Sequence, residues 1–225
     1  MKGLVLGGTG VIGSAVVRGL RARGVETTFT WHGNEARAKE LGGAAVQVDL
    51  TRADFADRLF DTTFDILVHC AAVHPLAPLA DLTAADFDVP VALAGRATFL
   101  AIRAFSRRLI AEKKPGHVVL VGALERAQSL PLSAPFAAAQ GMLGPLAMSF
   151  SKELGPHRIL VNLVAGGLVG DGVSRVLGPS DVESYKKLSA LHRLGTAEEI
   201  AAPVLFLALD NRYMTGKTLA ANGGI

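Results

Sequence analysis

Residues 2–20 read KGLVLGGTGVIGSAVVRGL, and they carry the strongest structural signal in the chain. The first part is a short apolar run typical of a buried strand, and the last part has the apolar spacing of an amphipathic helix. Glycines 7, 8, 10 and 13 separate the two. Glycines at such a junction permit a tight turn and let the backbone and the helix N-terminus approach an anion. The stretch therefore predicts a β-α unit with a nucleotide-binding loop.

The rest of the chain repeats this alternation of apolar strands and helical patterns. The further predicted strands are VETTFTW (25–31), AAVQVDL (44–50), FDILVHCAA (64–72), GHVVLVGA (116–123), RILVNLVAGG (158–167) and KTLAAN (217–222). Such alternation is typical of a parallel sheet covered by helices on both faces. We expect a single α/β domain over residues 1–225, with a doubly wound, parallel seven-stranded sheet in three αβα layers. Ligands of such sheets lie beyond the C-terminal ends of the strands.

The bulk composition excludes several classes of protein. Half of the 225 residues are apolar, which argues against disorder and allows a sizeable core. Lys and Arg number 23 against 20 Asp and Glu, and the net charge of +3 comes without any long basic run, so we expect no nucleic-acid partner. The lone Cys70 excludes an internal disulfide and suits a reducing compartment. His, Cys and carboxylate residues show no metal-ligand spacing, so we expect no metal site.

One uncharged segment, residues 127–150, approaches the length of a membrane span. It carries three prolines, three serines and Gln140, which favours a buried helix of a soluble protein. Glycines after Leu6 interrupt the apolar run at the N-terminus, which argues against a signal peptide. We therefore expect a cytoplasmic protein without membrane contact. Pro145 falls inside the helix predicted from about Phe136, and it predicts a kink there.

The end of the second predicted strand bears on the choice of cofactor. An acid usually holds a free ribose 2′-hydroxyl at this position, whereas here the strand ends in TWH (30–32) with no acid before Glu35. This disfavours NAD. His32 or Arg37 would suit a 2′-phosphate or have no ligand at all. Asp49, after the third strand, would either contact adenine or cap the turn that follows it.

With these segments in view, the chain resembles the short-chain dehydrogenase/reductase family over nearly its whole length, and within it the 3-oxoacyl-thioester reductases. The resemblance rests on GGTGVIG (7–13), VDLT (48–51), DILVHCAA (65–72), GHVVLVGA (116–123), KELGPHRILVNLVAGG (152–167), HRLGTAEEIAAPVLFLAL (192–209) and MTGKTLAANGG (214–224). It implies a Rossmann fold that binds NADP(H), with contacts from Gly7, Thr9, Gly10, Val11, Ile12, Gly13, His32, Asp49, Leu50 and Ala71. It also implies an acyl-thioester or other small-molecule ligand, and assembly as a homodimer, a homotetramer or a heteromer with an active relative.

The resemblance makes four residues conspicuous. Family members act through an Asn-Ser-Tyr-Lys group, in which the tyrosine donates a proton to the carbonyl of the substrate. The tyrosine and lysine lie four residues apart on one helix, and in PFAAAQG (135–141) these positions are Phe136 and Gln140. The register places Ala123 at the serine position, or Gly122 with a one-residue slip, and Ala94 at the asparagine position. The replacements predict that ordinary keto-reductase activity is absent.

A fifth departure concerns the loop that holds the nicotinamide and the phosphates in relatives. It reads GGLVGD (166–171), so Asp171 replaces a threonine. A carboxylate near a diphosphate is repulsive unless something shields it. We therefore expect NADP(H) binding to be weak or lost.

Few groups are available to replace the missing acid and base. His69, at the end of the fourth strand, and His74 beyond it either contact a ligand or have a structural role. Cys70 has no basic partner in the sequence and is expected to be buried and inert. Ser129 and Ser133 follow the fifth strand without a paired base, which disfavours a nucleophilic serine.

The two tyrosines of the chain do not fit the catalytic position. Tyr185, in ESYKKL (183–188), is expected to belong to a segment that covers the substrate in relatives. Tyr213 precedes Lys217 by four residues, but in a turn, where that spacing does not align side chains as it does in a helix. We expect Tyr213 to be a surface or packing residue.

Three functions follow from these patterns. The first is a non-reducing member of the fold that acts by association, as the partner of an active relative or as a carrier of a pathway intermediate. The second is a non-redox enzyme, such as a dehydratase, cyclase or isomerase, that uses His69 or His74. The third is an NADP(H)-dependent oxidoreductase with a proton donor outside the family pattern. Small residues near Gly141 would suit contact with a copy of the same helix.

Overall fold

The structure is a computed structural model that describes residues 1–75, 77–123, 132–172 and 177–225. Seven parallel strands form one sheet in the order β3-β2-β1-β4-β5-β6-β7. The strands are β1 (Lys2–Leu6), β2 (Glu26–Trp31), β3 (Ala44–Gln47), β4 (Ile66–His69), β5 (Gly116–Ala123), β6 (Ile159–Gly166) and β7 (Thr218–Ala221). Strand order reverses between β1 and β4, and a crevice at such a point is where ligands bind in open α/β sheets. The predicted fold class is confirmed.

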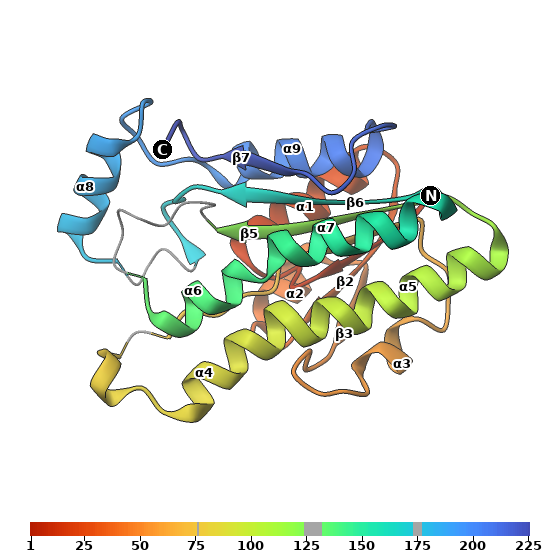
Figure 1. The fold of residues 1–225 in the computed structure, drawn as a ribbon, viewed down its shortest axis with the longest axis horizontal. Coiled ribbons are helices and arrows are strands. Elements are labelled where there is room, and N and C mark those ends of the chain that lie inside the picture. The colour runs from red at the N-terminus through yellow and green to blue at the C-terminus, as the bar shows by residue number, and fades with distance from the viewer. Residues whose placement is uncertain (76, 124–131, 173–176) are drawn as a thin grey trace.

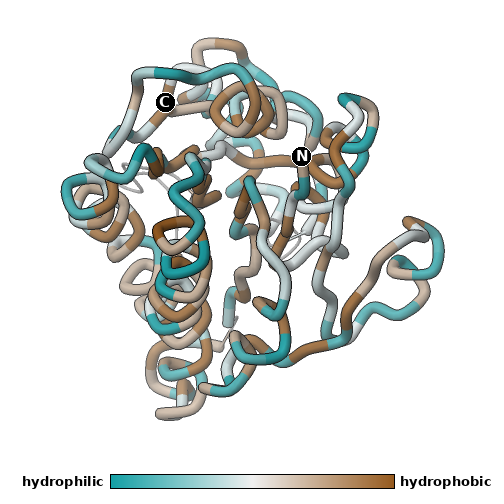
Figure 2. Tube along the Cα trace, turned by 90° about the vertical axis from the view of Figure 1, so that its right-hand side faces the viewer, coloured by the Kyte–Doolittle hydropathy of each residue, from teal (hydrophilic) through white to brown (hydrophobic). Residues whose placement is uncertain are grey.

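Helices cover both faces of the sheet (Figure 1). One layer holds α1 (Val11–Ala22), α2 (Glu35–Leu41) and α9 (Ala197–Leu209), and the other holds α3 (Phe55–Leu59), α4 (Ala84–Val91), α5 (Thr98–Glu112), α6 (Ala134–Gly141) and α7 (Leu143–Leu154). Strand side chains alternate between the two cores: Leu4 and Leu6 face one, and Val5 faces the other. The coils alternate teal and brown in Figure 2, as expected of helices with one buried face.

The helix before β5 is part of a longer helical run. The apolar spacing of the sequence predicts a helix from about residue 95 to residue 112, whereas α4, a π-helical segment at Ala92–Ala97 and α5 form one run, Ala84–Glu112. By length and composition this run could cross a membrane, as could many core helices, and 50% of its most apolar window is buried inside the protein. A π-helical turn marks a local departure from regular hydrogen bonding, and such turns often lie near functional sites.

The kink predicted at Pro145 is present as a break. Helix α6 ends at Gly141 and α7 begins at Leu143, with Met142 between them. Pro145 thus occupies the first turn of α7, where its missing amide hydrogen costs nothing. The break separates α6, which reaches the ligand edge of the sheet, from α7, which packs along β6.

The glycine loop is fixed by strand β2. The Gly7 amide donates to Oγ1 of Thr30 at 2.9 Å, and the Gly8 amide donates to the Thr30 carbonyl oxygen at 2.9 Å. Gly7 has a φ of +77°, and a Cβ atom on Gly13 would lie 2.2 Å from the Gly7 carbonyl oxygen. The turn therefore needs glycine at both positions because of its own packing.

Candidate functional site

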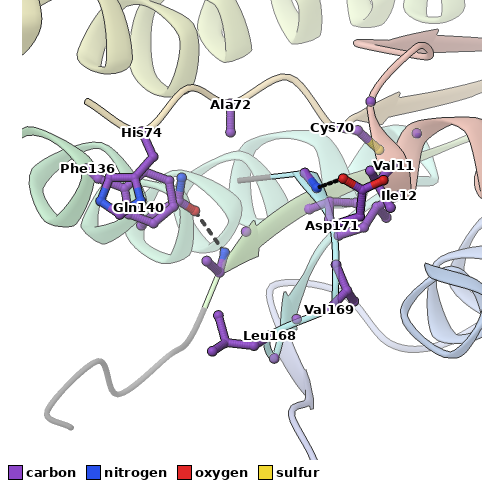
Figure 3. Close-up of a pocket in the computed structure, with 18 of the residues that line it drawn as sticks. Val11, Ile12, Cys70, Ala72, His74, Phe136, Gln140, Leu168, Val169 and Asp171 are labelled. Carbon is purple, nitrogen blue, oxygen red and sulfur yellow. Dashed lines mark hydrogen bonds between the residues drawn. The ribbon is translucent and has the colours of Figure 1, made fainter. Parts of the chain in front are cut away.

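A pocket of about 330 Å³ opens at the C-terminal edge of the sheet. It lies where the ends of β5 and β6, the start of α1 and one face of α6 meet (Figure 3). Its described lining comprises Gly10, Val11, Ile12, Gly13, Cys70, Ala72, His74, Val121, Gly122, Ala123, Leu132, Phe136, Gln140, Gly166, Gly167, Leu168, Val169, Asp171, Gly172 and Leu177. The pocket thus joins the predicted nucleotide loop to three of the four positions that the resemblance assigns to the family's catalytic group.

Three of these positions meet at one end of the pocket. Phe136 and Gln140 lie one turn apart on α6, and Ala123 is the last residue of β5. Their convergence supports the register inferred from the sequence. Among the lining residues that the structure describes, there is no tyrosine, lysine or serine. This end of the pocket therefore offers a benzyl ring, a carboxamide and a methyl group.

The Gln140 side chain is held by the end of β5. Its Oε1 accepts a hydrogen bond from the Ala123 amide at 2.9 Å, drawn as a dashed line in Figure 3. A backbone amide only donates, so this contact fixes which end of the carboxamide faces the strand. In the described part of the chain, the Gln140 side chain makes no other hydrogen bond. The Nε2 group is thereby turned away from Ala123.

His74 lies against the Phe136 ring. The two rings are stacked, with centroids 4.4 Å apart and planes at 24°. The Ser133 amide donates to Nε2 of His74 at 3.3 Å, so in the neutral ring the proton is on Nδ1. His74 lines the pocket, as Figure 3 shows. Of the two histidines that the sequence singled out, the structure brings this one to the site.

His69 does not line the pocket, so this candidate is not supported. Side chains alternate along β4, and His69 faces the same side as Leu67, beneath the π-helical segment at Leu93. It is 3% exposed, and its Nε2 has no hydrogen-bond partner among the residues that the structure describes. Burial lowers the pKa of His69 to about 4, against smaller opposing effects of the His69 and Leu93 backbone. His69 is therefore a neutral core residue.

Ala94, which the resemblance assigns to the asparagine position, is buried in the π-helical segment and is absent from the described lining of the pocket.

Cys70 does line the pocket, but burial raises the pKa of its thiol to about 12. The thiol stays protonated at neutral pH and is a weak nucleophile, in line with the expectation of an inert residue.

The two sides of the pocket differ in how well they suit a diphosphate: the glycine loop at the start of α1 favours an anion, and Asp171 on the other side carries a negative charge. Helix α1 begins at Val11, and the first amides of a helix have no partners within it, which favours an anion. Asp171 lies on the lining next to Val11 and Ile12 in Figure 3, and its Oδ1 accepts from the Gly172 amide at 2.7 Å. A carboxylate at this point opposes a second anion. The start of α1 would suit a diphosphate, and the weakening by Asp171 stays a prediction.

The remaining predicted cofactor residues lie outside the described lining of the pocket. His32 is exposed, Leu50 is buried in the core, and Ala71 packs against Gly7, while Thr9 sits in the glycine loop. Asp49 Oδ1 accepts from the Thr51 amide and hydroxyl at 2.8 and 2.7 Å, and these bonds lower the pKa of the carboxyl. Of its two predicted roles, Asp49 has the capping one in this structure.

Neither tyrosine belongs to the described lining of the pocket. Tyr185, expected in a cover over the substrate, is in α8 (Pro179–Leu188) but is only 1% exposed. Its hydroxyl donates to the Asn222 carbonyl oxygen at 3.0 Å and accepts from the Leu168 amide at 3.1 Å. The side chain is part of a small core with Leu168, and the place of its segment over the substrate stays a prediction. Tyr213 is 95% exposed, as predicted for a surface residue.

The serine candidates give no nucleophile in the described residues. Ser133 contacts His74 through its amide, and its buried Oγ has no hydrogen-bond partner. Ser129 lies outside the described residues. The apolar residues Leu132, Leu168 and Leu177 also line the pocket, and the sequence did not predict them as site residues. The one sequence feature that could have indicated these residues is their place after predicted strands, at the edge of the sheet where ligands bind.

Comparison with known proteins places this site in a family. The family model described as Enoyl-(Acyl carrier protein) reductase matches residues 8–225, and the chain belongs to this family of short-chain dehydrogenase/reductases. The chain is 27% identical to the short-chain dehydrogenase/reductase eriH of Hericium erinaceus, over 98% of the chain and 96% of that protein. It is 28% identical to the 3-oxoacyl-[acyl-carrier-protein] reductase FabG of Rickettsia prowazekii, over 99% and 95%.

A solved structure agrees with this assignment. The crystal structure of a blue fluorescent protein from a metagenomic library, in complex with NADPH, superposes with a TM-score of 0.88 at 27% identity, covering 99% of this chain and 96% of that one. The resemblance inferred from the sequence is thus confirmed. Binding of NADPH is a property of that relative.

Proposed function

We propose that this protein is a non-reducing member of the short-chain dehydrogenase/reductase family that binds a small apolar ligand, such as an acyl thioester, in the pocket at Phe136. What supports the proposal is the meeting of Phe136, Gln140 and Ala123 at one end of that pocket. A benzyl ring and a methyl group donate no proton, and a carboxamide does so only at extreme pH. Loss of a positioned proton donor costs a rate factor of about 10²–10⁴.

The similarity to reductases gives the opposing argument. The named relatives suggest ordinary oxidoreductase function, and the glycine loop retains its geometry. In our proposal the chain keeps NADP(H) binding in weakened form, with Gly10, Val11, Ile12 and Gly13 at the diphosphate. The nicotinamide group would supply hydride chemistry when bound. The residues of this chain would bind the nucleotide and the ligand but would not donate a proton to the carbonyl oxygen of a substrate.

Assembly forms a further part of the proposal. The exposed small residues of α6, Ala137, Ala138 and Gly141, leave room for close approach of a second helix. Ala139 of the same helix is buried in the core. We propose a homo-oligomer, either a dimer or a tetramer, or a heteromer with an active relative, in which this subunit binds a pathway intermediate. Its location in this proposal is the cytoplasm.

The test is an assay of NADPH consumption with a 3-oxoacyl thioester, run beside an active 3-oxoacyl-[acyl-carrier-protein] reductase. We expect a rate at least about 10²-fold below that of the active enzyme, in line with the missing proton donor. A melting-temperature titration with NADPH and NADP⁺ reports nucleotide binding separately. Reduction at a rate comparable to the active enzyme would overturn the proposal and favour an oxidoreductase with an unfamiliar proton donor.

A second function has one specific observation in its favour. His74 lies in the pocket against Phe136, close to where relatives have the tyrosine. An imidazole is suited to acid-base chemistry near neutral pH. It would serve a non-redox step such as dehydration of a β-hydroxyacyl thioester. The imidazole would take a proton from the α-carbon and, as imidazolium, give it to the β-hydroxyl, which leaves as water while the α,β double bond forms. Formation of the enoyl product without nucleotide, lost in His74→Ala and kept in His69→Asn, would establish this function.

A further inference from the structure

Residues 222–224, which follow β7, are bonded to α8 and its C-terminal end at two successive backbone carbonyls. The Tyr185 hydroxyl donates to the Asn222 carbonyl oxygen at 3.0 Å. The Ser189 hydroxyl donates to the Gly223 carbonyl oxygen at 2.9 Å. We infer that this strap, residues 222–224, holds α8 against the end of β6 and thereby controls access to the pocket at the ligand edge of the sheet.

Helix α8 has few other attachments to the body of the protein. It lies at one end of the molecule, beside the C-terminal end of the chain (Figure 1), and of its residues, all of which the structure describes, only Tyr185 is buried. Tyr185 packs with Leu168 in a small core that is separate from the two large cores of the sheet. Among the described residues, every hydrogen bond that leaves residues 178–192 ends on Leu168 or on the strap. An element with so little buried surface opens at a lower free energy than the core, so α8 depends on the strap for its place.

The point at which α8 is anchored is also a wall of the pocket. Leu168 lines the pocket, and its amide donates to the Tyr185 hydroxyl at 3.1 Å. Leu177, which precedes α8, lines the same pocket and packs against the core of Leu168 and Tyr185. A hollow of about 460 Å³ adjoins the pocket at Leu177 and is also lined by Asp181 of α8. A shift of α8 would therefore move the pocket wall and widen the way in.

The strap has room to move. A cavity of about 380 Å³ is lined by the strap, by Leu191 after α8, and by Glu199 and Ile200 of α9. Atoms that face a cavity lack packing partners on that side, so a displacement of the strap there breaks few contacts. The strap and α8 can therefore separate without disrupting either large core.

The close approach of the strap to Ser189 requires glycine at position 223. Gly223 has a φ of +72°, and a Cβ atom there would lie 2.6 Å from Oγ of Ser189. Gly223→Ala should therefore push the strap away from α8. Gly24→Ala is the matched control, because Gly24 has a φ of +76° and an added Cβ atom would meet nothing within 4 Å. Both changes impose a similar backbone strain, but only the first acts on α8.

Cys70 can report access to the pocket, because it is the only cysteine of the chain and lines the pocket. The measurement is the rate at which N-ethylmaleimide labels Cys70 at one fixed pH. Ser189→Ala deletes one hydrogen bond to the strap and should raise this rate about twofold to tenfold. We expect at least the same increase in Gly223→Ala and the wild-type rate in Gly24→Ala. Hydrogen exchange of the Leu168 amide should accelerate in the first two variants only.

Three outcomes would overturn the inference. The first is labelling at the wild-type rate in both Ser189→Ala and Gly223→Ala, each shown to be folded by its melting temperature; if Gly223→Ala does not fold, Ser189→Ala decides alone. The second is an equal increase in Gly24→Ala, since a general loss of stability would then explain the effect. The third is faster exchange of the Leu168 amide with unchanged labelling, since α8 would then move without opening the pocket. These measurements contain neither nucleotide nor substrate, so they are independent of the proposed function.

Discussion

The Tyr185 hydroxyl ties three separate segments together, and its removal is a sharp test of the structure. The ring is 1% exposed, and the hydroxyl bonds to the Leu168 amide and the Asn222 carbonyl oxygen. Tyr185→Phe keeps the ring and deletes both hydrogen bonds. At about 0.5–1.5 kcal/mol each, the free energy of unfolding should fall by about 1–3 kcal/mol. In a chain of this size that corresponds to roughly 2–12 °C in melting temperature.

Urea unfolding of the wild type and the variant gives this difference directly, provided that the slope against urea is unchanged. Tyr213→Phe is the matched control: the same atom is removed from a side chain that is 95% exposed, and stability should stay within about 0.5 kcal/mol. A Tyr185→Phe variant as stable as Tyr213→Phe would refute the burial and bonding described for Tyr185.

Gly167 provides a second, independent check of the same contact. A Cβ atom on Gly167 would lie 2.2 Å from the Tyr185 hydroxyl oxygen and 2.8 Å from the Asn222 Cα atom. Gly167→Ala should therefore destabilise the wild type more than it destabilises Tyr185→Phe. A double-mutant cycle should give a coupling energy of about 0.5–3 kcal/mol, and additive effects would contradict the geometry.

Three further changes test other parts of the structure. Burial lowers the pKa of His69 to about 4, so the folded protein holds this histidine neutral where the unfolded chain, with a pKa of 6.5, protonates it. The stabilisation is complete above pH 6.5 and is lost as pH falls to 4. Between these pH values the unfolding free energy of the wild type, measured with urea, should fall by roughly 3 kcal/mol more than that of His69→Asn. Asp171→Asn should tighten NADPH binding about fivefold by fluorescence titration, the effect of a charge repulsion of about 1 kcal/mol in the proposal, and an unchanged affinity would contradict that repulsion. Thr30→Val removes the acceptor of the Gly7 amide and should cost about 1–3 kcal/mol of unfolding free energy, whereas Thr30→Ser should restore most of it.

Much of the site followed from local sequence patterns. The glycine loop, the strand ends and the four-residue spacing of Phe136 and Gln140 define one edge of a parallel sheet, and the structure brings them to one pocket. Spacing along one helix fixes which residues share a face, so the meeting of Phe136 and Gln140 needed no knowledge of distant contacts. The break before Pro145 was predictable for the same reason, because proline acts on its own turn.

The sequence by itself therefore determined the order of strands and helices, the loop at Gly7 and the residue types at the ligand edge. Only the tertiary structure decided between the two histidines: the pleat of β4 turns His69 under a π-helical turn, while His74 meets Ser133, 59 residues away, and the ring of Phe136. It also made Tyr185 a core residue and turned the donor end of Gln140 away from β5. Periodicity records which way a side chain points within its own element, whereas partners from distant segments are set by how the elements pack.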